Sequence, residues 1–273
     1  MTRGHQQQHG FTLMELIMVI VIAGILGTMT VSFITKPMEG YIDLNRRAQL
    51  VDSAEMSMRM MARDIRRSLP NSIRCQPAGC DESGTIEMIN TVTGGRYRAA
   101  FSDDPSNPGN PMQFGDDTSF DVLGNVINAA EVNISTHQLV IYNLTSDGDD
   151  YNAYSTTGMH NRAGISDFSS NQITLDSPLG ISQGSPQQRF FIVDSTISYH
   201  CENNTLYRTQ PSGIAGTITT NTNTPVARNV IDCKFSYEPG SATRSALVTI
   251  GLTVEGDGER VTLLHQVHVD NVP

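Results

Sequence analysis

The sequence predicts an α+β fold in which one long N-terminal helix lies against an antiparallel β-sheet domain. Three observations predict it. Residues 16–34 carry no charged side chain over nineteen positions. Apolar residues then recur every three or four positions as far as residue 69, as on one face of an amphipathic helix. From residue 75 onward, short β-prone runs alternate with polar, turn-rich segments.

Charge is distributed unevenly along the 273 residues. Residues 1–74 hold nine basic and six acidic side chains, whereas residues 75–273 hold nine basic and twenty-two acidic ones. The acidic second part repels polyphosphate, which disfavours general nucleic-acid binding. An apolar content of 38% is too high for a disordered chain and too low for a membrane protein with many spans.

The N-terminal apolar segment is long enough to cross a membrane. As a helix, Phe11 to Ile34 would cover about 36 Å, and Arg3 on the short side favours a cytoplasmic N-terminus. A cleaved secretory signal peptide is disfavoured, because no small-residue cleavage site follows the segment. A plain membrane anchor leaves Glu15 unexplained.

The junction from Gly10 to Glu15, with the sequence GFTLME, supports a third interpretation. The polar leader ends at Gly10, the apolar Phe11 follows, and a single carboxylate lies four residues further on. This junction resembles the type IV prepilin signature. The resemblance implies cleavage after Gly10 by a prepilin peptidase, which also methylates the new N-terminal amine of Phe11.

The prepilin interpretation gives Glu15 a physical role. A lone carboxylate near the centre of a bilayer costs about 2.5–3.5 kcal/mol on insertion scales. Cleavage creates an α-amino group that is cationic at neutral pH. When apolar helices pack side by side, Glu15 of one subunit can neutralise the Phe11 amine of its neighbour and set their axial register. The alternative is that Glu15 is merely tolerated near a helix N-terminus.

The helix is expected to continue beyond the membrane, with Pro37 and Gly40 bending it and Pro70 closing it. The apolar stripe should pack on a folded domain. Its members are Tyr41, Leu44, Ala48, Val51, Ala54, Met58, Met61, Ile65 and Leu69.

Four arginines near the end of this helix suggest nucleic-acid binding at first sight. A helix C-terminus also favours cations, Glu55 and Arg59 form an i,i+4 pair, and no aromatic residues alternate with the arginines to stack bases. We therefore expect no nucleic-acid partner. The four residues are Arg59, Arg63, Arg66 and Arg67.

The second part of the chain is expected to be mostly strand and loop. Residues 255–259 supply a glycine-rich turn for a terminal hairpin. Long polar loops are predicted at 103–118, 145–171 and 210–226. The predicted strands are 85–90, 96–101, 138–143, 172–176, 189–200, 205–209, 230–237, 245–254 and 260–269.

The four cysteines are best explained as disulfides in an oxidising compartment. Cys75 and Cys80 enclose a short turn, and Cys201 and Cys233 lie in two predicted strands, so we expect the pairs Cys75–Cys80 and Cys201–Cys233. A tetracysteine zinc site remains the alternative, although the second pair lacks the short spacing that structural zinc prefers.

Segments outside the prepilin junction resemble one group of the larger minor pilins. The runs RDIRR at 63–67, ISYHC at 197–201 and LYR at 206–208 are similar to that group, and residues 264–273 are similar to the tail of MshO-type proteins of mannose-sensitive haemagglutinin (MSHA) pili. PilW-type minor pilins and J-type pseudopilins of type II secretion share most of these features.

This resemblance implies a structural protein without a cofactor. It divides the chain into a leader (1–10), a membrane and filament-core helix (11–35), an amphipathic helix (36–70) and a periplasmic β-rich domain (71–273). The implied partners are the prepilin peptidase and N-methyltransferase, the lipid bilayer before assembly, other major and minor pilins, and an inner-membrane platform protein. The implied role is filament initiation at the tip of a pilus used for attachment. A type II secretion role and a glycan-binding tip adhesin remain alternatives.

The sequence offers little enzyme chemistry. No nucleophile elbow, phosphate-binding loop or zinc-protease motif is present. Asp147, Asp149 and Asp150 suggest a calcium site only weakly, because position twelve of the corresponding loop is Gly158 and not glutamate. A solvated acidic loop is the favoured interpretation.

Overall fold

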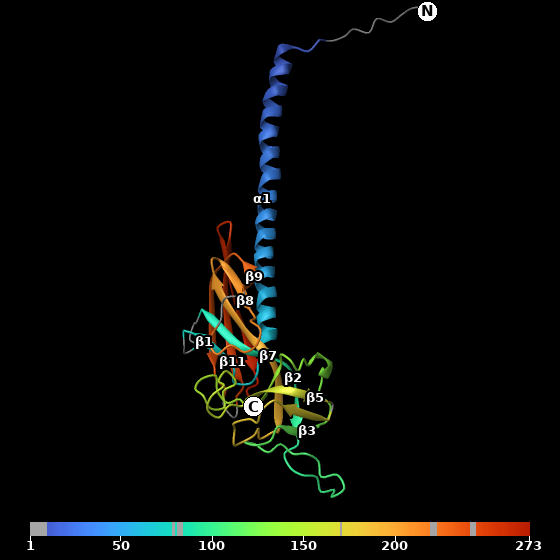
Figure 1. Cartoon of the computed structure of the whole chain (residues 1–273). Coiled ribbons are helices and arrows are strands. Elements are labelled where there is room, and N and C mark those ends of the chain that lie inside the picture. The colour runs from blue at the N-terminus through green and yellow to red at the C-terminus, as the bar shows by residue number, and fades with distance from the viewer. Residues whose placement is uncertain (1–9, 78–79, 81–83, 170, 219–222, 241–243) are drawn as a thin grey trace, which may run out of the picture. The chain divides into compact units, whose positions relative to one another are not determined.

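Figure 1 shows the computed structural model, which describes residues 10–77, 80, 84–169, 171–218, 223–240 and 244–273. The described chain begins with one long helix and continues as strands joined by loops. Its elements are α1 (Leu13–Arg66), β1 (Arg74–Gln76), β2 (Thr85–Tyr97), β3 (Ser119–Leu123), the 3-10 helix η1 (Ala129–Glu131), β4 (Gln138–Ile141), β5 (Arg162–Phe168), β6 (Gln172–Leu175), β7 (Arg189–Glu202), β8 (Thr205–Thr209), β9 (Asn223–Arg228), β10 (Val230–Glu238), β11 (Ala246–Gly256) and β12 (Glu259–Val269).

The chain forms two compact units, Met1–Gln49 and Leu50–Pro273. The described part of the first unit is almost entirely helix. The helix continues through Pro37 and Gly40, so neither residue ends it. A proline inside a helix removes one backbone hydrogen bond, which a helix of 54 residues can lose without ending.

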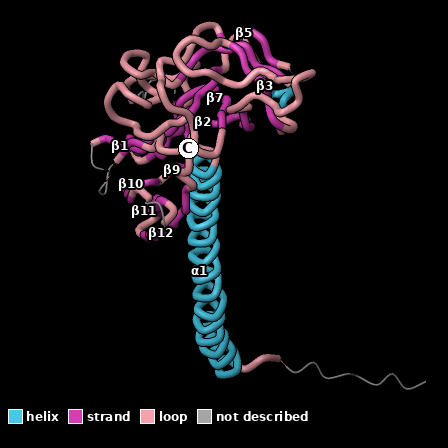
Figure 2. The backbone as a smooth tube through the Cα atoms, turned by 90° about the horizontal axis from the view of Figure 1, so that it is seen from below, coloured by secondary structure: helices cyan, strands magenta, loops and turns pink. Residues whose placement is uncertain are grey.

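The second unit contains two antiparallel sheets. One has nine described strands in the order β1-β2-β3-β6-β5-β4-β7-β8-β9, and the other has the order β10-β11-β12. Figure 2 shows β10, β11 and β12 grouped together, apart from β3 and β5. One long helix followed by antiparallel sheet confirms the predicted α+β class.

The amphipathic stripe packs where the sequence predicts it in the second unit. Ala54, Met58, Met61 and Ile65 are at most 4% exposed and share one hydrophobic core with the three-stranded sheet. Leu69, after the helix, is also fully buried, whereas Tyr41 and Leu44 belong to the first unit and are exposed. The sheet residues of this core include Phe235, Val248, Ile250, Leu252 and Val267.

A second hydrophobic core is formed by residues of the nine-stranded sheet, on the strands from β2 to β7. It is built from Phe120, Leu139, Ile173, Phe190 and their neighbours, on strands that lie between residues 97 and 192. The long strands β2 and β7 pair antiparallel along most of their length and contribute to both cores. Every buried residue of the described chain lies in Leu50–Pro273, so this unit has its own complete core.

The prediction of two strands at 85–90 and 96–101 is wrong. Residues 85–97 form one strand that continues through Gly94 and Gly95, and residues 98–101 are not in a strand. A Cβ on Gly95 would lie 2.7 Å from the Phe190 ring, and one on Gly94 would lie 2.8 Å from the Phe190 carbonyl oxygen. The glycines therefore permit close strand packing here and do not mark a turn.

The predicted loops at 145–171 and 210–226 are also partly wrong. The first contains β5 (Arg162–Phe168), which is too polar to be predicted as a strand. The second contains the start of β9 (Asn223–Arg228), which lies at the edge of the sheet and includes Pro225. The strand β3 (Ser119–Leu123) is likewise absent from the prediction. The terminal hairpin is confirmed: β11 and β12 pair in register around Asp257 and Gly258, both with positive φ.

Candidate functional site: the prepilin-like N-terminus

Gly10 is exposed, and the described structure gives no packing reason for a glycine at this position. A Cβ built on it has no described atom within 4 Å. Packing therefore does not require a glycine at this position, whereas the prepilin signature does. This combination is typical of a site that another protein recognises.

Helix α1 begins at Leu13, and Thr12 provides the cap at its start. The Glu15 backbone N–H donates to the Thr12 carbonyl at 3.0 Å and to Thr12 Oγ1 at 3.3 Å, and Leu16 N–H donates to the same carbonyl at 3.2 Å. Thr12 and Glu15 therefore occupy the first and last positions of a capping-box sequence. The residues that the structure describes provide the Glu15 carboxylate with no hydrogen-bond or ion-pair partner.

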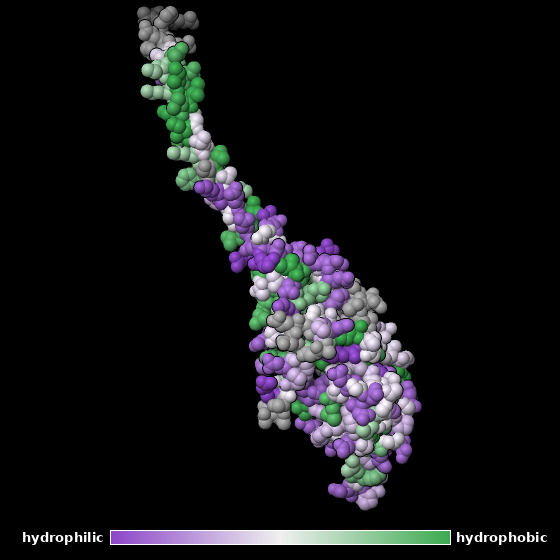
Figure 3. Space-filling model, turned by 90° about the vertical axis from the view of Figure 1, so that its left-hand side faces the viewer, coloured by the Kyte–Doolittle hydropathy of each residue, from purple (hydrophilic) through white to green (hydrophobic). Residues whose placement is uncertain are grey.

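The helix that follows exposes its apolar side chains all round. Phe11 is 80% exposed and Phe33 is 81% exposed, as are most large apolar residues between them to a lesser extent. Figure 3 shows this concentration of hydrophobic residues along the N-terminal part of the helix. Among the described residues, α1 is the one helix long and apolar enough to cross a membrane, and its apolar window has no buried residue. So much exposed apolar surface requires lipid or another protein to cover it.

Residues 5–31 match the family model of the prokaryotic N-terminal methylation motif. The N-terminus of the chain is therefore prepilin-like, and the match covers 27 of the 273 residues. The motif implies processing by a prepilin peptidase and assembly with other pilins, and the apolar helix fits a single membrane anchor. No match was found among curated proteins or among solved structures.

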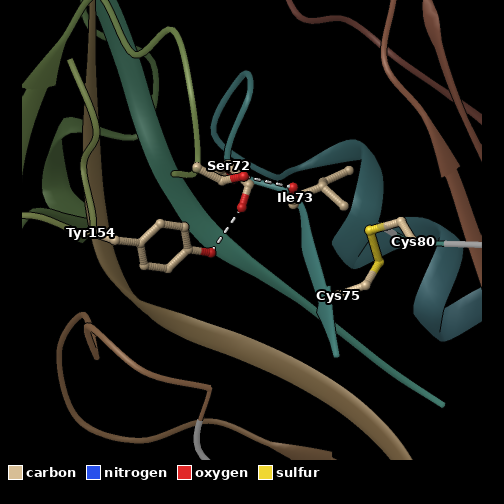
Figure 4. Close-up of a disulfide and its surroundings, with 6 residues drawn as sticks. Ser72, Ile73, Cys75, Cys80 and Tyr154 are labelled. Atoms are coloured by element: carbon tan, nitrogen blue, oxygen red, sulfur yellow. Dashed lines mark hydrogen bonds between the residues drawn. A yellow bond between two sulfur atoms is a disulfide. The ribbon is translucent and has the colours of Figure 1, made fainter. Parts of the chain in front are cut away.

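Both disulfides form in the second unit, Leu50–Pro273. Cys75 pairs with Cys80 and Cys201 with Cys233, the pairs that the sequence favours. Figure 4 shows the first disulfide and the hydrogen bond in which the Tyr154 hydroxyl donates to the Ser72 carbonyl at 2.8 Å. Disulfide-bonded sulfur is not available as a thiolate ligand, so the tetracysteine zinc alternative does not apply to this structure.

In the acidic segment 147–150, the carboxylates of Asp149 and Asp150 accept hydrogen bonds from residues 155–159. Asp149 accepts hydrogen bonds from the hydroxyls of Ser155 and Thr157 at 3.1 and 3.0 Å, and Asp150 accepts one from the Met159 N–H at 2.8 Å. In the described ranges, no group of three or more His, Cys, Asp or Glu is placed to hold a metal ion. The weak calcium suggestion for Asp147, Asp149 and Asp150 therefore gains no structural support.

Asp64 links the helix to the nine-stranded sheet, a role that sequence reasoning missed. Its Oδ2 accepts hydrogen bonds from Tyr199 Oη at 2.6 Å and from Arg208 Nε at 2.8 Å. Burial raises the pKa of Tyr199, and the negative charge of Asp64 raises it further. The sequence does show Asp64 as an acidic residue inside the basic run 63–67. It could not show the role of Asp64, because the two residues that bond to it lie more than 130 positions away in the chain.

His200 is buried beside the second disulfide. It is 6% exposed and stacks on Tyr207 with ring centroids 5.6 Å apart, and the structure gives neither ring nitrogen a hydrogen-bond partner. Because burial disfavours the charged ring, the pKa of His200 lies below its usual value of 6.5, although Glu202 opposes the shift. The neighbouring Cys201 is bonded to Cys233, so its sulfur is not available as a thiolate nucleophile.

We expect His200 to make stability depend on pH. Below pH 6.5 the unfolded chain binds a proton at His200 that the folded chain does not bind. The free energy of unfolding therefore decreases as the pH is lowered, until the pH reaches the pKa of His200 in the folded protein. His200→Phe keeps an aromatic ring beside Tyr207 and should remove this contribution. Denaturant unfolding of residues 50–273 at pH 8, 6 and 5 measures the difference. Identical pH dependence in both proteins would show that His200 does not contribute.

Proposed function

We propose that this protein is a minor pilin of the MshO type, which helps to initiate assembly at the tip of an MSHA-type type IV pilus used for surface attachment. The observation that carries the proposal is the methylation motif on an exposed apolar helix. The resemblance of residues 197–201 and 206–208 to the larger minor pilins, and of residues 264–273 to the tail of MshO-type proteins, supports the finer assignment.

In this proposal the four segments defined by the sequence act in turn. The leader, residues 1–10, is removed after Gly10, and Phe11 becomes the methylated N-terminus. The helix of residues 11–35 then anchors the protein in the inner membrane, with the N-terminus in the cytoplasm. Residues 36–70 and 71–273 lie in the periplasm, where the two disulfides are stable.

Assembly moves the apolar helix from lipid into a filament. A platform protein in the inner membrane delivers the subunit, and packing against the helices of other pilins replaces its lipid contacts. The Glu15 carboxylate, which has no partner in the described chain, pairs with the Phe11 amine of a neighbouring subunit. This pairing fixes the axial position of each subunit.

Replacing Gly10 by leucine should leave an unprocessed precursor, because the peptidase recognises the small residue that precedes the cleaved bond. The intact mass of the protein purified from its native host measures this directly. Gly27→Leu is the matched control: Gly27 lies inside the helix, and a Cβ added to it would also have no described atom within 4 Å. The control should mature normally. A normally matured Gly10→Leu protein would exclude this cleavage site.

Deletion of the gene separates the pilus role from the related secretion role. Loss of surface pili with normal exoprotein secretion is expected. Loss of secretion with normal piliation would instead assign the chain to the type II pseudopilins, whose J-type members it also resembles. Normal piliation with lost attachment to glycan-coated surfaces would favour the tip-adhesin alternative.

A further inference from the structure

A basic groove lies beside the residues that follow helix α1, on a unit that is otherwise acidic. It has a volume of about 310 Å³ and is lined by Arg66 and Arg67, by Val92 of β2, by Arg189 and Phe191 of β7, and by Asp270 and Val272 of the C-terminal segment. Three arginines therefore border a small cavity whose wall is partly apolar.

The arginines of this groove lack acidic partners among the described residues. In the described residues, the side chains of Arg66 and Arg67 have no ion-pair or hydrogen-bond partner, and Arg189 donates to the Val272 carbonyl at 3.4 Å. Asp270 forms no ion pair with them; its carboxylate accepts the Val272 N–H at 3.1 Å. By contrast, five other arginines of the chain, Arg59, Arg74, Arg98, Arg208 and Arg260, each lie within 3.2 Å of an acidic side chain.

The walls of the groove are fixed before any ligand arrives. The Arg67 carbonyl accepts the Thr91 N–H at 3.1 Å, which ties the end of the helix to β2. The C-terminal segment is held by the Ser185 hydroxyl, which donates to the Pro273 carbonyl at 2.8 Å, and by Asn271, which donates to the Tyr237 hydroxyl at 2.6 Å. A preformed site loses little conformational entropy when a ligand binds.

We propose that this groove binds a carboxylate side chain from an acidic segment of a partner protein. Guanidinium groups match carboxylates in geometry and charge, and clusters of arginine are a recurring means of recognising acidic motifs. The apolar wall at Phe191 and Val92 suits the aliphatic part of such a segment. The small volume fits one anchoring side chain, and the acidic surroundings repel an extended polyanion such as a nucleic acid.

Binding of a short acidic peptide to the full-length protein in uncharged detergent tests this proposal. The probe copies residues 145–154, which contain three aspartates, and carries an uncharged fluorophore. Fluorescence polarisation gives the Kd. The double variant R66Q/R67Q should bind at least about ten-fold more weakly, in line with the loss of charge-assisted hydrogen bonds. A probe with asparagine at all three aspartates should not bind.

A charge-matched control separates this site from general attraction between opposite charges. R228Q/R244Q removes two exposed arginines outside the groove and should leave the Kd unchanged within about two-fold. Circular dichroism checks that both double variants are folded. Equal weakening in the two double variants, or no binding to the parent protein, would overturn the proposal. Displacement of the probe by inorganic phosphate or a sulfated glycan at lower concentration than by unlabelled peptide would overturn the assignment to a protein carboxylate.

Discussion

Replacing Glu15 by alanine is expected to leave the protein in the membrane and to abolish its incorporation into a filament. The substitution makes the apolar helix easier to insert, because a carboxylate is costly in lipid. It removes the one acidic group of the first helical turn, which in our proposal neutralises the terminal amine of a neighbouring subunit. Immunoblots of membrane and sheared-filament fractions measure the two outcomes separately.

Thr12→Ala is the matched control for this experiment, because the structure shows that Thr12 and Glu15 also meet at the helix start. The cap uses the backbone N–H of Glu15, which alanine at position 15 retains. Thr12→Ala removes the cap at a cost of about 1 kcal/mol but keeps the carboxylate. It should still assemble. Equal loss of assembly in both variants would identify the helix start, and not the carboxylate, as the requirement.

Replacing Glu87 by glutamine is expected to destabilise the second unit by about 3 kcal/mol, because it leaves the Arg74 guanidinium, which is 15% exposed, without its counter-charge. The Glu87 side chain is 1% exposed, and one of its oxygens lies 2.5 Å from Arg74 Nη2. The Arg74 guanidinium also lies 3.6 Å from the centre of the Tyr154 ring. Arg74 therefore joins β1, β2 and the segment that contains Tyr154.

Two further variants of residues 50–273 show whether the lost charge pair is responsible. R74M/E87M removes both charges and should be more stable than E87Q, since no unpaired buried charge remains. Glu255→Gln breaks the exposed pair with Arg260 and should cost at most about 1 kcal/mol. Urea unfolding followed by circular dichroism gives the free energies. An E87Q cost no larger than that of Glu255→Gln would show that burial does not strengthen this pair.

Local sequence signals predicted the elements whose causes are local. The apolar run and the three-or-four spacing predicted helix α1, and a glycine-rich turn between alternating strands predicted the β11–β12 hairpin. The strands β3, β5 and β9 escaped prediction because their sequences are short, polar or interrupted by proline. They are strands because neighbouring strands pair with them, which a single segment does not reveal.

The candidate sites divide in the same way. The prepilin-like junction is a contiguous signal, so Gly10, Phe11 and Glu15 could be identified from the sequence alone. Asp64 and the basic groove could not, because each depends on partners far away in the chain, such as Arg208 for Asp64 and Arg189 for the groove. The sequence showed a basic run at the helix end but not which arginines would remain unpaired.

The sequence by itself determined the features of the N-terminal segment: a polar leader that ends at a prepilin-like junction, an apolar helix that needs lipid or other helices to cover it, and a single acid near the start of that helix. These features follow from residue order and hydrophobicity. Only the tertiary structure decided that Asp64 pairs with Arg208 while Arg66 and Arg67 have no ionic partner among the residues described, and that Gly94 and Gly95 continue a strand. Those outcomes depend on which strands meet across the sheet, because burial and pairing are set by neighbours in space and not by neighbours in sequence.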